Sequence, residues 1–431
     1  MNNLALWVFR LMISLLLTFL ALIVFLILAP DETPSELSSR LRAEGNSAVG
    51  NYGEGFTYLM GIGAPTGADP KRLGTRRIVA YLEALSQPHD EQYEYVEKIP
   101  AIEMPMIYSV KWGGCALDQP QCIAGVLTNE MQLDDLIAFS DEIFRRYQHL
   151  LSLQNHENSL PNHFDAPAAH LQYVAQGNFA LIFRAIKAAI TDPDEHATRL
   201  LLADIERHRE LLAQANTLVS KMVHSAAIER TISVLNALQI WELADSSAPL
   251  PELNKEERSL AKPLAGEFAA YANQFDELAQ SKNLFSFDFR LPEWTNRAAL
   301  KKNKFLNRLA VRTRYFIDNS ERELGGFSTA EIHSEIGGLD LLINPIGTAF
   351  IKIADDTNYD TYSARTQDLN RKILLFNQIR QGRTQWAERG EDSMGFYAEG
   401  DTLVCFDRLL PIQGQSQQVC LLKAAKSEPS S

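Results

Sequence analysis

The sequence predicts a mainly α-helical protein with an N-terminal transmembrane helix and a small C-terminal β-meander. Three observations predict this: an uncharged apolar run near the N-terminus, apolar residues at helical spacing through most of the chain, and alternating, turn-rich segments near the end. The expected parts are an anchor over 1–30, a linker over 31–50, a helical domain of antiparallel pairs over 51–390, a meander over 391–424 and a disordered tail over 425–431.

The apolar run over 11–29 contains no charged residue, and as a helix it matches the ~30 Å hydrocarbon core of a bilayer. Two alternatives are less favoured. A cleaved signal would have a shorter core and a small residue where Ile27 stands, and a buried core helix would more often lie inside the domain. Arg10 precedes the run and Asp31 follows it, so the positive-inside rule places the N-terminus in the cytoplasm. In a bacterium, the helical domain is then expected in the periplasm, anchored to the inner membrane.

The composition is acidic, with 41 basic and 54 acidic side chains and a net charge of -13. Because Arg10 is the one charged residue among the first thirty, the part beyond the anchor is more acidic still. Such a body repels phosphate backbones at long range, so a nucleic-acid partner is excluded. The glycines over 61–67 lack the context of a dinucleotide or phosphate loop, and no cofactor is expected.

Four cysteines fall in two local pairs, Cys115 with Cys122 and Cys405 with Cys420. In an oxidising compartment each pair is expected to close as a disulfide, worth roughly 2 to 3 kcal/mol by loop entropy. A zinc site is the alternative, but the Cys-x2-Cys spacing of such sites is missing.

After a glycine-rich segment over 51–74, which is expected to form a loop packed on the body, amphipathic patterns predict a series of helices. A seam from Leu201 to Met222 alternates spacings of four and three, as in an antiparallel helix pair. The expected helices lie at 36–42, 74–86, 129–153, 168–190, within 192–244, 262–279, 296–319 and 362–389, with strand-like segments at 104–112 and 285–291 and a break at 246–251 that divides the domain.

Histidines recur every seven residues at His149, His156, His163 and His170. On one helix they would share a face and bind a metal, but prolines at 161 and 167 break the run, so no metal site is predicted. A fifth, His208, lies on the apolar seam one turn after Asp204 and is expected to be hydrogen-bonded between paired helices.

A nucleophile is conceivable at Ser328, with His333 and Glu335 nearby in the sequence. The segment GGFSTA has alanine at the last position of the GxSxG elbow, however, so the tight turn that exposes such a serine is not specified. No catalytic residue is therefore predicted.

One basic helix stands out in this acidic chain, and its residues form either a solvated face or a docking face for an acidic partner or anionic headgroups. They are Lys301, Lys302, Lys304, Arg308, Arg312 and Arg314.

The leading functional hypothesis is a non-enzymatic, single-pass inner-membrane protein whose periplasmic domain binds another envelope protein, as an assembly factor, chaperone or inhibitor. One alternative is a periplasmic hydrolase with an unfamiliar site near Ser328 or within 149–170. Another is a lipid-handling domain whose uncharged helix over 168–190 lines a cavity.

Overall fold

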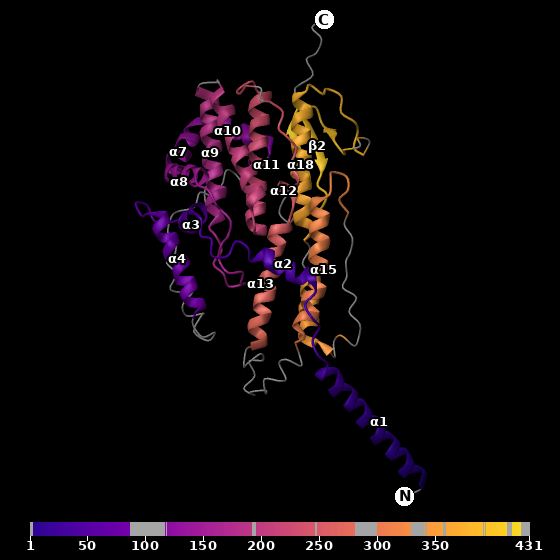
Figure 1. The fold of residues 1–431 in the computed structure, drawn as a ribbon. Helices are drawn as coiled ribbons and strands as arrows, with labels where there is room; N and C mark the ends of the chain where they lie inside the picture. The colour runs from indigo at the N-terminus through magenta and orange to yellow at the C-terminus, as the bar shows by residue number, and fades with distance from the viewer. Residues whose placement is uncertain are drawn as a thin grey trace.

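The computed structural model is mainly helical and carries a small three-stranded sheet near its C-terminus (Figure 1). This confirms the predicted mainly helical fold and the small C-terminal sheet. The structure describes residues 3–86, 117, 119–191, 195–245, 248–280, 300–328, 340, 343–356, 359–390, 392, 394–411 and 416–423. The predicted strand-like segments at 104–112 and 285–291 lie outside these residues, as does the tail.

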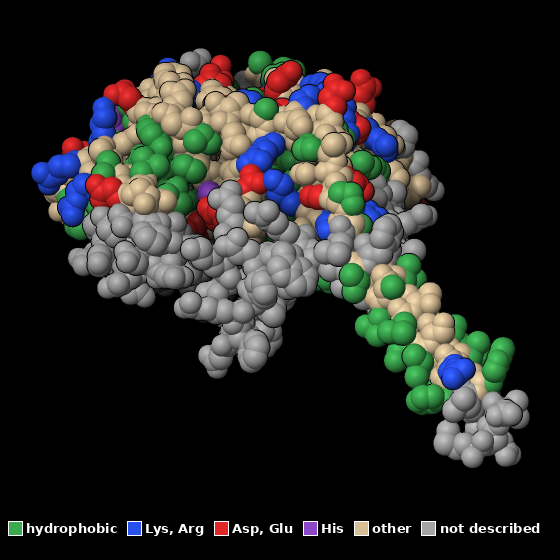
Figure 2. All heavy atoms as spheres, turned by 60° about the horizontal axis from the view of Figure 1, so that its bottom comes forward, with side chains coloured by type: hydrophobic (Ala, Val, Ile, Leu, Met, Phe, Trp, Pro, Cys, Tyr) green, Lys and Arg blue, Asp and Glu red, His purple; other side chains and the backbone are tan. Residues whose placement is uncertain are grey.

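The N-terminal helix α1 (Asn3–Leu28) projects from the body (Figure 1). Its described large apolar side chains are exposed, from Trp7 at 68% to Val24 at 51%, and Figure 2 shows apolar side chains along its length. Over the residues that the structure describes, no helix combines the length and apolarity needed to cross a membrane. The transmembrane anchor therefore stays a prediction.

The segment after α1 is attached to the body. Asp31 accepts hydrogen bonds from the backbone amides of Asn303 and Lys304, at the start of α15 (Lys302–Glu321). Short helix α2 (Glu36–Gly45) then buries Leu41 against α13 (Ala261–Gln280) and α15. Much of the predicted linker over 31–50 thus packs on the domain.

The glycine-rich segment forms a helix, α3 (Glu54–Gly61), which packs closely on α4 (Pro70–Leu85). The glycines permit this close approach, since a Cβ added at Gly74 would lie 1.8 Å from the Thr57 carbonyl oxygen. The expectation of a loop at 51–74 was therefore wrong for residues 54–61 and 70–73, although the segment does pack on the body, with Phe56 buried.

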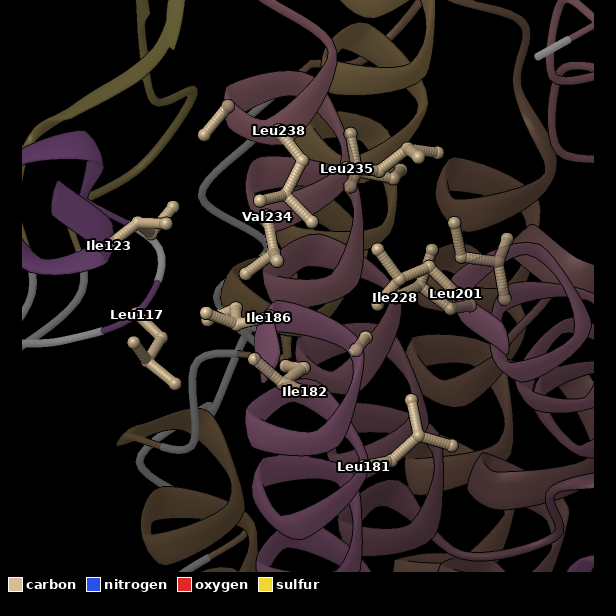
Figure 3. Packing of buried hydrophobic residues seen from close by; sticks show 14 of the residues in the cluster. Leu117, Ile123, Leu181, Ile182, Ile186, Leu201, Ile228, Val234, Leu235 and Leu238 are labelled. Atoms are coloured by element: carbon tan, nitrogen blue, oxygen red, sulfur yellow. The ribbon is translucent and has the colours of Figure 1, made fainter. Parts of the chain in front are cut away.

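The main core lies between helices that are consecutive in the chain, as the sequence pattern predicted. Figure 3 shows Ile182 and Ile186 of α9 beside Val234 and Leu235 of α11, with Leu201 of α10 nearby. These helices are α6 (Pro120–Leu127), α7 (Glu130–Phe139), α8 (Asp141–Ser152), α9 (Leu171–Thr191), α10 (Glu195–Gln214) and α11 (Leu218–Ile240).

Two predicted continuous helices are interrupted. The helix expected over 129–153 breaks at Ser140, where Arg184 of α9 donates hydrogen bonds to the Ile137 carbonyl and the Ser140 hydroxyl. The seam predicted through Met222 ends where α10 ends, so Val219 is 63% exposed rather than buried.

The C-terminal half forms a second core with α2, α13 and α15, and its last helix joins the two cores. Residues 345–356 form a helix where none was predicted. The helix predicted over 362–389 ends early, at Arg380, because Gly382 has a φ of 77°. The remaining helices are α12 (Lys255–Arg258), α17 (Pro345–Asp356) and α18 (Asp360–Arg380).

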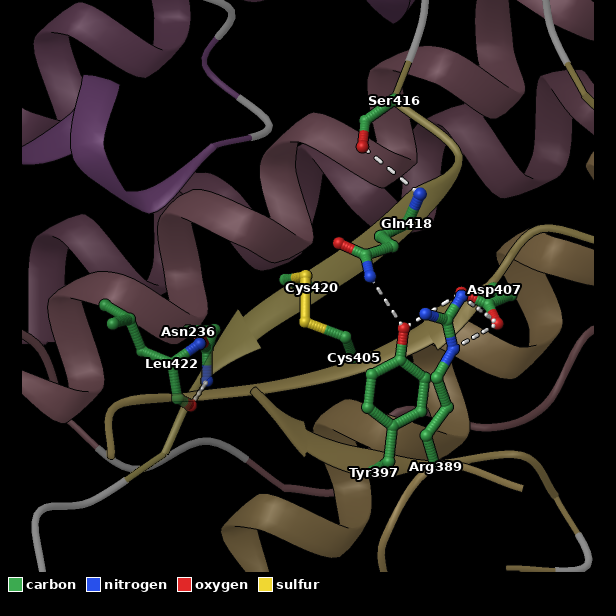
Figure 4. Close-up of a disulfide and its surroundings, with 9 residues drawn as sticks. All are labelled: Asn236, Arg389, Tyr397, Cys405, Asp407, Ser416, Gln418, Cys420 and Leu422. Carbon is green, nitrogen blue, oxygen red and sulfur yellow. Dashed lines mark hydrogen bonds and ion pairs between the residues drawn. A yellow bond between two sulfur atoms is a disulfide. The ribbon is translucent and has the colours of Figure 1, made fainter. Parts of the chain in front are cut away.

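The predicted meander is confirmed as an antiparallel sheet in the order β1 (Tyr397–Glu399), β2 (Leu403–Asp407), β3 (Gln418–Leu422). Cys405 and Cys420 face each other on β2 and β3 and form the predicted disulfide (Figure 4). Asn236 of α11 bonds both backbone groups of Leu422, which fixes the sheet to the helical body (Figure 4).

Candidate functional site: a groove beside helix α10

A groove with a volume of about 810 Å³ runs between α10 and the segment 248–262. This volume lies within the range of ligand pockets, roughly 300 to 1,000 Å³. Its lining residues lie on α10, on and beside α12, and at the start of α13, and Figure 1 shows where these helices lie in the fold. The apolar lining residues are Leu202, Ile205, Ala213, Ala215, Ala248, Pro249, Leu250, Pro251 and Ala261.

Arg209 of α10 fastens the opposite wall to the helix. Its guanidinium donates from Nε and Nη2 to the two carboxylate oxygens of Glu257, at 2.7 and 2.8 Å, and also to the carbonyls of Pro251 and Glu252. The Arg209 and Glu257 side chains are only 12% and 5% exposed, so water screens this pair weakly.

Glu257 also closes a capping box with Asn254, in which each side chain accepts a hydrogen bond from the other's backbone amide. This pattern starts α12 and satisfies amides that the helix itself leaves unpaired. The wall of the groove is therefore specified both locally, by Asn254 and Glu257, and from across the groove, by Arg209.

Lys221 of α11 also holds this wall, through hydrogen bonds to the backbone. Its buried Nζ donates to the carbonyls of Leu212 in α10 and Glu256 in α12, at 2.8 and 3.0 Å. Burial lowers the pKa of Lys221 to about 7, while the nearby Glu257 carboxylate opposes this shift. The lysine thus joins three helices through its ammonium group.

A buried polar cluster lies in the core that α10 shares with α8, α9 and α11. The Tyr147 hydroxyl donates to Asp204 and lies 2.6 Å from His208 Nε2, while His208 Nδ1 lies 2.9 Å from His224 Nδ1. Asn178 donates to the second Asp204 oxygen. These bonds are all satisfied if His208 carries its proton on Nε2 and His224 on Nδ1.

The electrostatics of this cluster follow from its burial. Burial raises the pKa of Asp204 to about 6, against the hydrogen bonds from Tyr147 and its other donors. Burial, helped by the Arg230 and Arg207 charges, lowers the pKa of His208 to about 3, so this imidazole is neutral near pH 7. His208 is therefore a hydrogen-bonded core histidine, as predicted.

The four regularly spaced histidines do not share a helix, because α8 ends at Ser152 and α9 begins at Leu171. In the described part of the chain, no three histidine, cysteine or acidic residues are placed to hold a metal ion. His156 and His163 line a second hollow of about 340 Å³, His149 packs edge-on against Tyr58, and His170 lies beside Arg77.

The hydroxyl-bearing candidate Ser328 is exposed, and its backbone is held by the side chain of Asn319. His333 and Glu335 lie outside the described residues, so the hypothesis of a serine nucleophile stays untested. Cys115 also lies outside them, and its pairing with Cys122 stays a prediction.

The basic residues over 301–314 lie on or beside α15, and most of them form ion pairs with acidic residues of the same chain. Arg312 is buried and its guanidinium lies 5.3 Å from the centre of the Phe316 ring; Lys301 is also buried. The ion pairs join Lys302 with Asp276, Lys304 and Arg308 with Asp340, and Arg314 with Asp318. Docking through this face stays a prediction.

The groove was not predicted from the sequence, although residues 248–251, within the predicted break, form part of one wall. The Asn254-x-x-Glu257 capping box was a readable signal for α12. Arg209 and Lys221 gave no comparable signal, because their partners are mostly backbone carbonyls distant in the sequence.

No protein family, curated protein or solved structure matches this chain.

Proposed function

We propose that this chain is a membrane-anchored binding protein, with its N-terminus in the cytoplasm and a periplasmic helical body that holds a segment of another envelope protein. The observation that carries the proposal is the groove of about 810 Å³ between α10 and residues 248–262. A mainly apolar concavity of this size on a helical body is typical of a binding site.

The groove is preorganised, which favours binding. Arg209, Glu257 and Lys221 hold both walls through buried hydrogen bonds within the chain itself. A site already formed loses less conformational entropy when its partner arrives. This supports a receptor whose own shape changes little on binding.

The anchor rests on the apolar run over 11–29 and on the exposure of the apolar side chains along α1. Asp31 caps the first turn of α15, so the body is attached to the end of the anchor through a short, hydrogen-bonded segment. The Cys405–Cys420 disulfide supports placement in an oxidising compartment such as the periplasm.

The proposal is tested by capture from native membranes. Tagged full-length protein is purified in mild detergent as wild type, as Ala213→Trp and as Val311→Trp, and co-purifying proteins are quantified by mass spectrometry. Ala213 lines the groove, whereas Val311 is 65% exposed on α15 and serves as the matched control.

The expected result is one envelope protein captured in stoichiometric amount by the wild type and by Val311→Trp, and lost from Ala213→Trp. Circular dichroism confirms that both variants are folded. Equal capture by both variants, or recovery of every form alone, would contradict the proposal.

A further inference from the structure

The rim of the groove carries an excess of negative charge. Four carboxylates and two cations line the groove; Arg209 pairs with Glu257, and Glu210 pairs with Arg207, outside the lining. Lys262 pairs with Glu157, outside the lining. Glu206 and Glu256 are exposed on the rim and form no ion pair with any described residue.

The floor between these carboxylates is apolar. Ile205 and Leu250 are buried at its base, and Leu202 and Ala213 form its side along α10. An occupant must therefore cover apolar surface in the middle and meet negative charge at the edge.

The length of the groove favours a polypeptide over a small molecule. Its lining on α10 extends from Leu202 to Gln214. At about 1.5 Å per residue, these positions span ~18 Å along the helix axis. That length matches about five or six residues of an extended chain, at ~3.3 Å each.

We infer that the occupant of this groove is a polypeptide segment with apolar side chains toward the floor and lysine or arginine side chains toward Glu206 and Glu256. This inference rests on the proposed function and adds the chemical class of the partner. Opposite charges at such a rim act mainly on the association rate and on specificity, and their effect falls as salt is added.

The test uses two synthetic peptides of about twelve residues, long enough as a helix to match the groove. Both share one leucine pattern, with lysine at the remaining positions in the first and glutamate in the second. Fluorescence anisotropy measures their binding to full-length protein in discs of neutral phosphatidylcholine, and empty discs give the blank.

The charge reversal Glu206→Lys with Glu256→Lys is compared with Glu399→Lys with Asp401→Lys. The control pair is exposed at the β1–β2 turn and changes the net charge equally. The lysine peptide is expected to bind the wild type, to bind the rim variant about tenfold more weakly, and to bind the control within about twofold of wild type.

Equal binding of the two peptides, or equal losses in the rim and control variants, overturns the inference. If Ala213→Trp still removes the membrane partner in that case, the proposed function stands and only the basic character of the partner is wrong. If Ala213→Trp changes neither peptide binding nor partner capture, the groove is not the site and both fail.

Discussion

Replacing Arg209 with methionine tests whether the groove wall is held from α10. The substitution keeps a long apolar side chain and removes the guanidinium, and with it the two bonds to Glu257 and those to the carbonyls of Pro251 and Glu252. The Glu257 carboxylate then stays buried, and the backbone amide of Asn254 still donates a hydrogen bond to it.

The expected loss of unfolding free energy is about 3 kcal/mol. Removing one partner of a buried ion pair costs roughly 3 to 5 kcal/mol, because the other charge is left without compensation. The low end applies here because Glu257 keeps the Asn254 amide. By contrast, Arg314 pairs with Asp318 at 44% and 47% exposure, so Arg314→Met is expected to cost under about 1 kcal/mol.

The assay is urea unfolding of the full-length protein in non-ionic detergent, followed by far-ultraviolet circular dichroism. Glu257→Gln is measured alone and together with Arg209→Met. The resulting double-mutant cycle isolates the coupling free energy between the two side chains, which is expected to be about 2 kcal/mol. If Arg209→Met costs no more than Arg314→Met, or if the coupling is zero, the wall is not held as described.

Three further predictions concern the body, each read by the same urea titration. Gly74→Ala is expected to cost roughly 1 to 3 kcal/mol of unfolding free energy, because the new Cβ meets the Thr57 carbonyl. Gly125 faces open space on α6, so Gly125→Ala is expected to stabilise by about 0.5 to 1 kcal/mol. The reverse order would refute the close packing of α3 on α4. Cys405→Ala opens a disulfide that spans 15 residues and is expected to cost about 3 kcal/mol, whereas wild type and variant are expected to be equally stable when both are reduced. In the folded chain the pKa of His208 is lowered to about 3, so on acidification the unfolded chain is protonated at a higher pH than the folded chain, and stability falls as pH falls from about 6.5. His208→Gln should flatten this slope by up to about 1.4 kcal/mol per pH unit. An unchanged slope would count against a neutral buried imidazole.

The sequence predicted those features that depend on local pattern. Alternation and cysteine spacing located the strands and the Cys405–Cys420 disulfide, and helical periodicity located most of the helices, including α9 with its apolar surface. These features were predictable because each is specified by residues close together in the chain.

The features that were missed depend on contacts between distant segments. Gly74 was placed where a predicted loop over 51–74 meets a predicted helix over 74–86, but its role is to let α4 approach Thr57 of α3. No helix start was predicted at Asn344–Pro345, although Asn344 accepts a hydrogen bond from the Gly347 amide and Pro345 occupies the first turn of α17. The groove depends on Arg209 reaching carbonyls more than forty positions away.

The most direct test of the central claim is site-specific photo-crosslinking in living cells. A benzoylphenylalanine at Ala248, which is exposed on the groove wall, is compared with one at Val311 on α15. A single protein adduct is expected from position 248 and not from position 311, with lysine or arginine close to the crosslinked residue. The same adducts from both positions, or none from position 248, would contradict it.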